Sequence, residues 1–366
     1  MQRKFPWNYF IFLNYLKQTK GDFILISIFN SIFLFSWVEN MKVALRLIEI
    51  TDNLKQVMKF WESLPKSKQP KCQSFTVLKE ALSDPFLKAK LHFFSYVANL
   101  IEPYLEKFQA DKPMVPFMYH ELKSIIQNLL ELVVKPSVLA AAKNLPQNWS
   151  EIDLEKEENL IPVKNLQFGL AVEEVLSDIR KKDHANSKQM KEFLASARTF
   201  LVSMLEKLFE QSPICSTFLK AASVLDPNVL FNNEKDVLVK RFRIMLKSII
   251  KLAIMPAHKA EKALKDFKAF VDLMKSSPHT FSEKSDRLDD YYFSQFNITK
   301  HEELSFVVRL VLTLSHGQAT VERGFNLNKS LLKTNMTPET IISKRIIRDY
   351  MLSNNASHHR NNPVDD

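Results

Sequence analysis

Cysteine and histidine are the residue types that most often bind metals or take part in nucleophilic catalysis, so their positions are the first guide to chemistry. Cys72 and Cys215 are 143 positions apart, and the nine histidines are scattered without clustering around either of them. Zinc sites need ligands at short, paired spacings, and no Ser/His/Asp or Cys/His arrangement can be argued from this distribution. We therefore expect no metal site, no cofactor and no disulfide framework.

Lysine and arginine give a stronger signal in the middle of the chain. Between residues 234 and 268, ten basic and four acidic residues give a local net charge of +6, out of +10 for the whole chain. Four of the basic residues recur every three or four positions and line one face of a predicted helix whose other face is apolar. With Arg241 they are candidate contacts to DNA phosphates, and a solvated helix face is the alternative. The four are Lys240, Arg243, Lys247 and Lys251.

The scarcity of glycine excludes whole classes of function. The chain of 366 residues holds 4 glycines, where average usage would give about 26. Dinucleotide-binding and phosphate-binding loops need several glycines within a few residues, because the backbone must approach the phosphates closely. We therefore expect no small-molecule substrate. With 46% hydrophobic and 25% charged residues, the composition is typical of a mainly helical globular protein with a large core.

Helical periodicity dominates from residue 37 onward. A predicted helix entered at Pro85 carries one apolar stripe, which we interpret as core-facing because three heptads are few for a coiled coil. A second helix carries such a stripe from Leu122 to Val133 and ends before Pro136. Over 141–165 the pattern breaks, and five acids around Trp149 indicate a solvated linker. The first stripe consists of Leu87, Leu91, Phe94, Ala98, Ile101, Leu105 and Phe108.

The last fifth of the chain contains an apolar run over 306–314 and, further on, the start of another helix. Thr337 is placed to cap that helix, and Pro338 suits its first position. The spacing predicts a buried face formed by Ile342, Ile346 and Tyr350.

The sequence LTLSHGQATVERGFNLNKSLLKTNMTPETI, residues 312–341, resembles the carboxy-terminal dimerisation region of hAT superfamily DNA transposases. The usual form there is an apolar run, a small-residue turn and A-x-x-E-R-x-F-S, with Asn326 here in place of the last serine. Four further segments are similar to landmarks of the same transposon-derived proteins, so the resemblance covers about residues 37–352. These segments are Trp37-Val38-Glu39-Asn40, Asp84-Pro85 to Pro116, Leu225-Asp226-Pro227 and Arg287-Leu288-Asp289.

The resemblance implies a ribonuclease H-like core in which two aspartates and a glutamate hold two divalent metals. Glu322 matches the family glutamate. Both aspartates should precede Trp37, and Asp22 is the only acidic residue there. We therefore expect an amino-terminally truncated or domesticated remnant that is not an enzyme, in which Glu322 pairs with a basic neighbour such as Arg323.

Residues 1–36 form an apolar amino-terminal segment with several alternatives. The uncharged residues 23–38 would span about 24 Å as a helix, short of the roughly 30 Å hydrocarbon core, so we expect no membrane span. A signal peptide is a second alternative, although no clear small-residue cleavage site follows the apolar run. A buried strand or helix is the third alternative.

Together these observations predict a mainly α protein, a multi-helix bundle, and the resemblance implies that it keeps a small remnant of a ribonuclease H-like α/β core near residues 23–36 and 162–168. The predicted units are the apolar segment at 1–36, a helical unit at 37–140, an acidic linker at 141–165, a helical, basic unit at 166–275, a linker at 276–300, the hAT-like dimerisation region at 301–352 and a disordered tail at 353–366.

The resemblance implies a nuclear, non-catalytic interaction protein that forms a homodimer through its carboxy-terminal region, with DNA as a second partner. Two alternatives stay open. One is a DNA transposase whose amino-terminal catalytic part is missing from this sequence, and the other is a DNA-binding module that uses the basic helix. The candidate subunit contacts, whose spacing equally suits an intramolecular core, are Phe306, Val307, Leu310, Val311, Leu314, Val321, Phe325, Leu332, Ile342 and Ile346.

Overall fold

The computed structural model describes residues 37–110, 112–143, 145–182, 187–276, 281–295, 300–314 and 337–353. Within these ranges the regular structure is helical, and no strand forms. One isolated antiparallel bridge pairs Val134 with Leu160. The predicted mainly α fold class is therefore confirmed.

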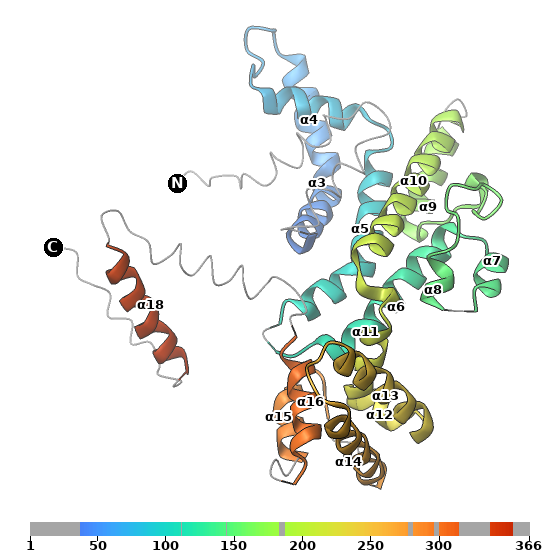
Figure 1. Ribbon diagram of the computed structural model, residues 1–366. Coiled ribbons are helices and arrows are strands. Elements are labelled where there is room, and N and C mark those ends of the chain that lie inside the picture. Colours follow the sequence, from blue (N-terminus) through green and yellow to red (C-terminus); the bar gives the residue numbers. More distant parts are fainter. Residues whose placement is uncertain are drawn as a thin grey trace.

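Long helices form one end of the molecule (Figure 1). The helix α3 packs along α5, α4 packs on α3, and α5 also contacts α9. The 3-10 helix η1 packs against α10. The bounds are α3 (Trp37–Ser63), α4 (Gln73–Ser83), α5 (Leu87–Phe108), η1 (Val163–Asn165), α9 (Leu170–Lys182) and α10 (Ser187–Gln211).

The centre is built around α6, which contacts α5, α10, α11 and the 3-10 helix η4. Short helices lie near it. Three of them, α7, α8 and η3, have proline in their first turn, where the backbone N–H has no helical partner. The bounds are α6 (Val115–Val133), α7 (Pro136–Ala141), α8 (Pro146–Trp149), η3 (Pro213–Cys215), α11 (Thr217–Ala222) and η4 (Ser223–Leu225).

The other end of the molecule consists of α12–α16, while α18 stands apart from the other labelled helices (Figure 1). The helix α14 packs against α12, α13 and α16, and α16 also contacts α15 and α6. The bounds are α12 (Pro227–Asn232), α13 (Lys235–Lys251), α14 (Ala257–Ser276), α15 (Leu288–Gln295), α16 (Glu302–Leu312) and α18 (Pro338–Ser353).

The apolar stripes predicted from periodicity form the core. In α5 the stripe residues are buried except Leu105, which is partly buried. In α6 the apolar residues from Leu122 to Val133 are buried except Leu132, which is partly buried. The α5 stripe is thus core-facing, as predicted. One hydrophobic cluster extends from Ala44 in α3 to Val311 in α16.

The segment 141–165 packs against the helices rather than forming the predicted solvated linker. Trp149 is among the largest fully buried side chains, and Leu154 and Leu160 are also buried. Arg198 of α10 makes a two-point ion pair with Glu157, at 2.9 and 2.5 Å. The acids therefore face outward or bind Arg198 while the apolar residues between them enter the core.

The predicted linker at 276–300 contains a helix. Leu288 and Tyr292 of α15 are buried, and the Tyr292 hydroxyl donates to the carbonyl oxygen of Leu225 at 2.9 Å. A buried phenol of this kind needs a hydrogen-bond partner. This bond ties α15 to the turn before α12.

The predicted strand remnant does not form at 162–168, and its other part, 23–36, lies outside the described residues. Residues Val163–Asn165 form the 3-10 helix η1 instead. Phe168 packs edge-on against Phe93 of α5, with ring centres 5.0 Å apart. Residues for which the family resemblance implied a strand are therefore packed against helices instead.

Candidate functional site

The helix α16 divides the predicted subunit contacts between core and surface. Val307 and Val311 are fully buried within the chain, on the side where α16 packs against α14. Leu310 is partly buried against the same core. Phe306 and Leu314 are exposed. The two valines therefore pack within the chain, which was the alternative to subunit contact. Of the predicted contacts in the 306–314 run, Phe306 and Leu314 lie on the surface.

The helix α18 begins as predicted but exposes its apolar residues. The Thr340 amide donates to Thr337 Oγ1 at 3.4 Å, and Pro338 is the first helical residue. Ile342 and Ile346 are 59% and 62% exposed, and Ile347 and Tyr350 are also exposed. The predicted face exists, but it is not buried within the described part of this chain.

The remaining predicted contacts Val321, Phe325 and Leu332 lie outside the described residues, as does Glu322. In the ranges that the structure describes, no three His, Cys, Asp or Glu side chains converge in a way that could hold a metal ion. No helix in those ranges is long and apolar enough to span a membrane.

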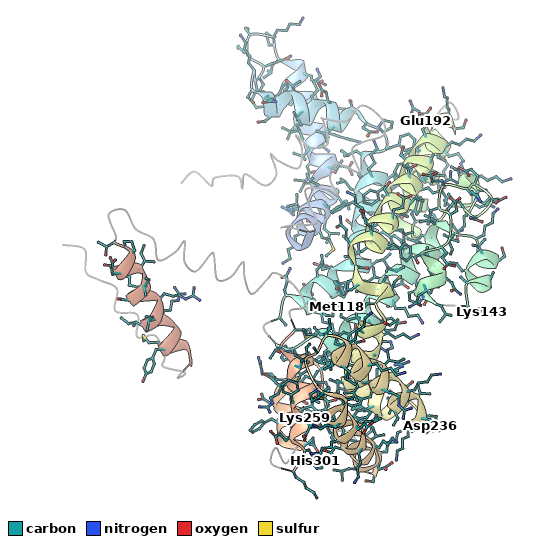
Figure 2. All side chains as sticks on the ribbon, viewed as in Figure 1. Met118, Lys143, Glu192, Asp236, Lys259 and His301 are labelled. Atoms are coloured by element: carbon teal, nitrogen blue, oxygen red, sulfur yellow. The ribbon has the colours of Figure 1, made fainter. Side chains whose placement is uncertain are left out.

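The basic face of α13 is exposed as the sequence predicts. Its apolar face is buried against α11 and α14. Lys240, Arg243, Lys247 and Lys251 all lie in exposed positions, and no ion pair joins any of them to a carboxylate among the described residues. Figure 2 shows side chains projecting from this end of the molecule, where Asp236 marks the start of α13 and Lys259 the start of α14.

Arg241 does not belong to this exposed face. Consecutive helical residues are turned by about 100°, so Arg241 points away from the stripe that contains Lys240. Its Nη1 donates to the Ser223 hydroxyl at 3.4 Å, and its charge acts on Lys220 of α11 and His120 of α6. Arg241 therefore belongs to a second, half-buried basic cluster that the sequence analysis missed.

The second cluster contains Lys123, Lys220 and Arg241, from α6, α11 and α13. Lys220 Nζ lies 5.9 Å from the centre of the Tyr119 ring, and Lys123 Nζ lies 5.8 Å from that of Trp149. Burial, followed by the charges of Arg241 and Lys123, lowers the pKa of Lys220. No sequence pattern joins these residues, because almost 100 positions separate Lys123 from Lys220.

An apolar cleft of 330 Å³ lies between α15 and α16. Tyr292 and Phe293 line it from α15, and Val308 and Leu312 line it from α16. Phe293 is exposed. The cleft is a second apolar surface in the carboxy-terminal part of the described chain.

The aspartates of the family-like landmarks have structural roles here. Asp84 Oδ1 accepts from the Phe86 amide at 2.8 Å, and Asp226 Oδ1 accepts from the Asn228 amide at 2.9 Å. Asp289 pairs with Arg287 at 2.8 Å. Each bond fixes a turn or the first residues of a helix.

Comparison with protein-family models, with curated proteins and with solved structures found no match to this chain. The resemblance to hAT transposases rests on the sequence motifs.

Proposed function

We propose that this chain is a non-catalytic interaction protein related to hAT transposases and that it self-associates through α18. The observation that carries the proposal is the exposure of Ile342, Ile346 and Ile347 on one helix. Burial of an isoleucine side chain contributes about 1.5–3 kcal/mol, so covering three of them gives a substantial driving force. A second copy offers the same face, as the two-fold contacts of homodimers require.

The cleft between α15 and α16 supports this proposal. It offers apolar side chains within the same carboxy-terminal part of the chain, and Phe293, which lines it, adds exposed aromatic surface. An amphipathic helix binds such a groove through residues spaced by three or four positions. Ile342 and Ile346 of a second copy have that spacing.

The proposal assigns no reaction to the chain, since Glu322 is the one family carboxylate that the motif supplies. A nuclear location and a ribonuclease H-like remnant around 23–36 belong to the same proposal, because they too rest on the resemblance.

Light scattering of the full chain over a range of concentrations tests self-association. We expect a dimer that dissociates on dilution, and we expect the double change Ile342→Gln and Ile346→Gln to give a monomer. Lys344→Gln is the matched control, because Lys344 is exposed on the opposite side of α18. A full chain that stays monomeric at every concentration contradicts the proposal, as does a dimer that survives the double change.

A second candidate function, binding to duplex DNA, is favoured by the exposed basic face of α13. DNA phosphates attract such a stripe, and the affinity then falls as salt increases, with a slope of about −0.9 per phosphate neutralised. We expect the triple change of Lys240, Arg243 and Lys247 to glutamine to weaken binding and to reduce that slope.

The matched control removes three positive charges at the far end of the molecule. Lys59, Lys66 and Lys68 are exposed in α3 and the turn after it. Their change to glutamine should leave DNA affinity nearly unaltered. Equal losses in the two triple variants would show that net charge alone, rather than the α13 face, governs binding.

A further inference from the structure

Three cations from three helices meet where α11 packs between α6 and α13. Lys123 is in the first half of α6, Lys220 in the last turn of α11, and Arg241 in the second turn of α13. All three are half-buried. The packing of α11 against α6 and α13 brings the three backbones together, and Arg241 and Lys123 are both near enough for their charges to act on Lys220.

The cluster carries unbalanced positive charge. Among the described residues, no ion pair joins any of the three cations to a carboxylate. Glu121 lies close enough to act on neighbouring His120, but Lys107 already binds its Oε1 at 2.5 Å. Like charges at short range repel strongly where water is partly excluded. A protein that holds them together gains when an anion is bound between them.

His120 lies beside the cations and has hydrogen-bonding capacity to spare. Its Nε2 is buried without a partner among the described residues. Burial, then Arg241 and Lys123, lowers the pKa of the imidazole, and Lys220 acts in the same direction while Glu121 opposes them. A buried polar atom without a partner is costly, and an oxyanion would give it one.

We propose that Lys123, Lys220 and Arg241 form a binding site for a phosphate group. The guanidinium of Arg241 suits two oxygens of a phosphate, and the ammonium groups of the lysines act as point charges beside it. The phosphate is either free or part of a nucleic-acid backbone. The site uses other residues than the α13 face and α18, so it goes beyond the proposed function and can fail independently of it.

The first test is thermal unfolding of the full chain in inorganic phosphate and in chloride at equal ionic strength. We expect phosphate to raise the Tm by about 2 °C or more at saturation, because a ligand that binds only the folded state stabilises it. Lys220→Gln and Arg241→Gln should lose this shift. Lys240→Gln, one residue away on the exposed face, should keep it.

The same variants separate binding from a structural role. In chloride, Lys220→Gln should be as stable as the natural sequence or more so, because it relieves repulsion between the cations. Phosphate also stabilises proteins without binding them. An equal phosphate shift in the natural chain and in both cluster variants would therefore overturn the proposal.

Nuclear magnetic resonance of the His120 ring gives an independent readout. The pKa of His120 should rise when phosphate is bound, since the anion offsets the charges of Arg241, Lys123 and Lys220. An unchanged titration curve at saturating phosphate contradicts the site. The titrations with and without phosphate share the effects of Tyr119 and Glu121 on His120, so these effects cancel when the two pKa values are compared.

Competition with duplex DNA distinguishes the two sources of phosphate. If the phosphate is part of a backbone, Lys220→Gln should weaken DNA binding and inorganic phosphate should compete with DNA at the cluster. If it is free, the variant should lose the phosphate-induced Tm shift and keep its DNA affinity. If Lys220→Gln keeps both the phosphate-induced Tm shift and its DNA affinity, the proposed site is wrong.

Discussion

Asp226 shows how one buried carboxylate can make stability depend on pH. Its side chain is 7% exposed, and its Oδ1 accepts from the Asn228 amide at the start of α12. Burial raises the pKa of Asp226 from 3.8 to about 6, although the bonds from Asn228 oppose the shift. Because the folded pKa lies above the unfolded one, the folded protein holds an additional proton between these values. Stability therefore falls as the pH rises through this window.

Asp226→Asn should stabilise the protein at neutral pH. The amide oxygen of asparagine can still accept the bond from Asn228, and the cost of a buried charge is removed. We expect the free energy of unfolding to rise by about 1–3 kcal/mol at neutral pH and the gain to shrink towards zero near the unfolded pKa. Urea unfolding at several pH values measures both.

Asp226→Ala is the control, because it removes the charge and the cap together. Its free energy of unfolding should be about 1 kcal/mol lower than that of Asp226→Asn at every pH. A loss of stability in Asp226→Asn at neutral pH would mean that the ionised carboxylate stabilises the fold.

At the scale of the element, the start of α9 depends on one glycine. Gly169 has a φ of +92°, and its carbonyl oxygen accepts from the amides of Val172 and Glu173. A Cβ at this position would lie 2.8 Å from Cδ2 of Tyr96 in α5. The absence of a side chain therefore permits both the turn into α9 and its close packing on α5.

Gly169→Ala should destabilise the protein by about 1–3 kcal/mol, because the backbone conformation is strained for alanine and the Tyr96 ring must move. Leu170→Ala is the matched control, since Leu170 is 84% exposed and its loss should change stability by no more than about 0.5 kcal/mol. Chemical denaturation of both variants gives the comparison. Similar values for the two would show that neither the turn nor the contact with Tyr96 limits stability.

The elements that could be predicted from the sequence are those with a long periodic pattern. In α5, α6 and α13, apolar residues recur over several turns, so the buried face is evident without any tertiary information. Trp149 and Tyr292 could not be placed in this way, because each lies in a short segment beside charged residues, with no apolar pattern sustained over several turns, and its burial depends on distant helices. Composition indicates a linker there, and tertiary packing overrides it.

The same difference separates the two basic surfaces. The α13 face was predictable because its four cations lie within twelve positions of one helix. The cluster of Lys123, Lys220 and Arg241 was not, because it forms only when α6, α11 and α13 pack together. Arg241 was grouped with the exposed stripe by its position in the sequence, although its place around the helix separates it from Lys240.

At the scale of the whole molecule, α16 belongs to the core and α18 does not. Leu304, Val307, Val308 and Val311 are buried in the continuous hydrophobic cluster. Burial of each contributes about 1.5–3 kcal/mol, and the sum approaches the total stability of a typical domain. The exposed apolar residues of α18 make no comparable contribution within the chain.

Two truncations should consequently behave differently. A chain that ends at residue 300 loses α16, so it should unfold at a much lower temperature and expose apolar surface that binds a hydrophobic dye. A chain that ends at residue 336 keeps α16 and should retain the Tm of the full chain at a concentration where the full chain is monomeric. Circular dichroism and dye fluorescence measure both. Equal Tm values for the two truncated chains would show that α16 adds little to the core. A low Tm for the chain that ends at residue 336 would place α18 within the folded unit. Either result would contradict the assignment of α16 to the core and of α18 to association.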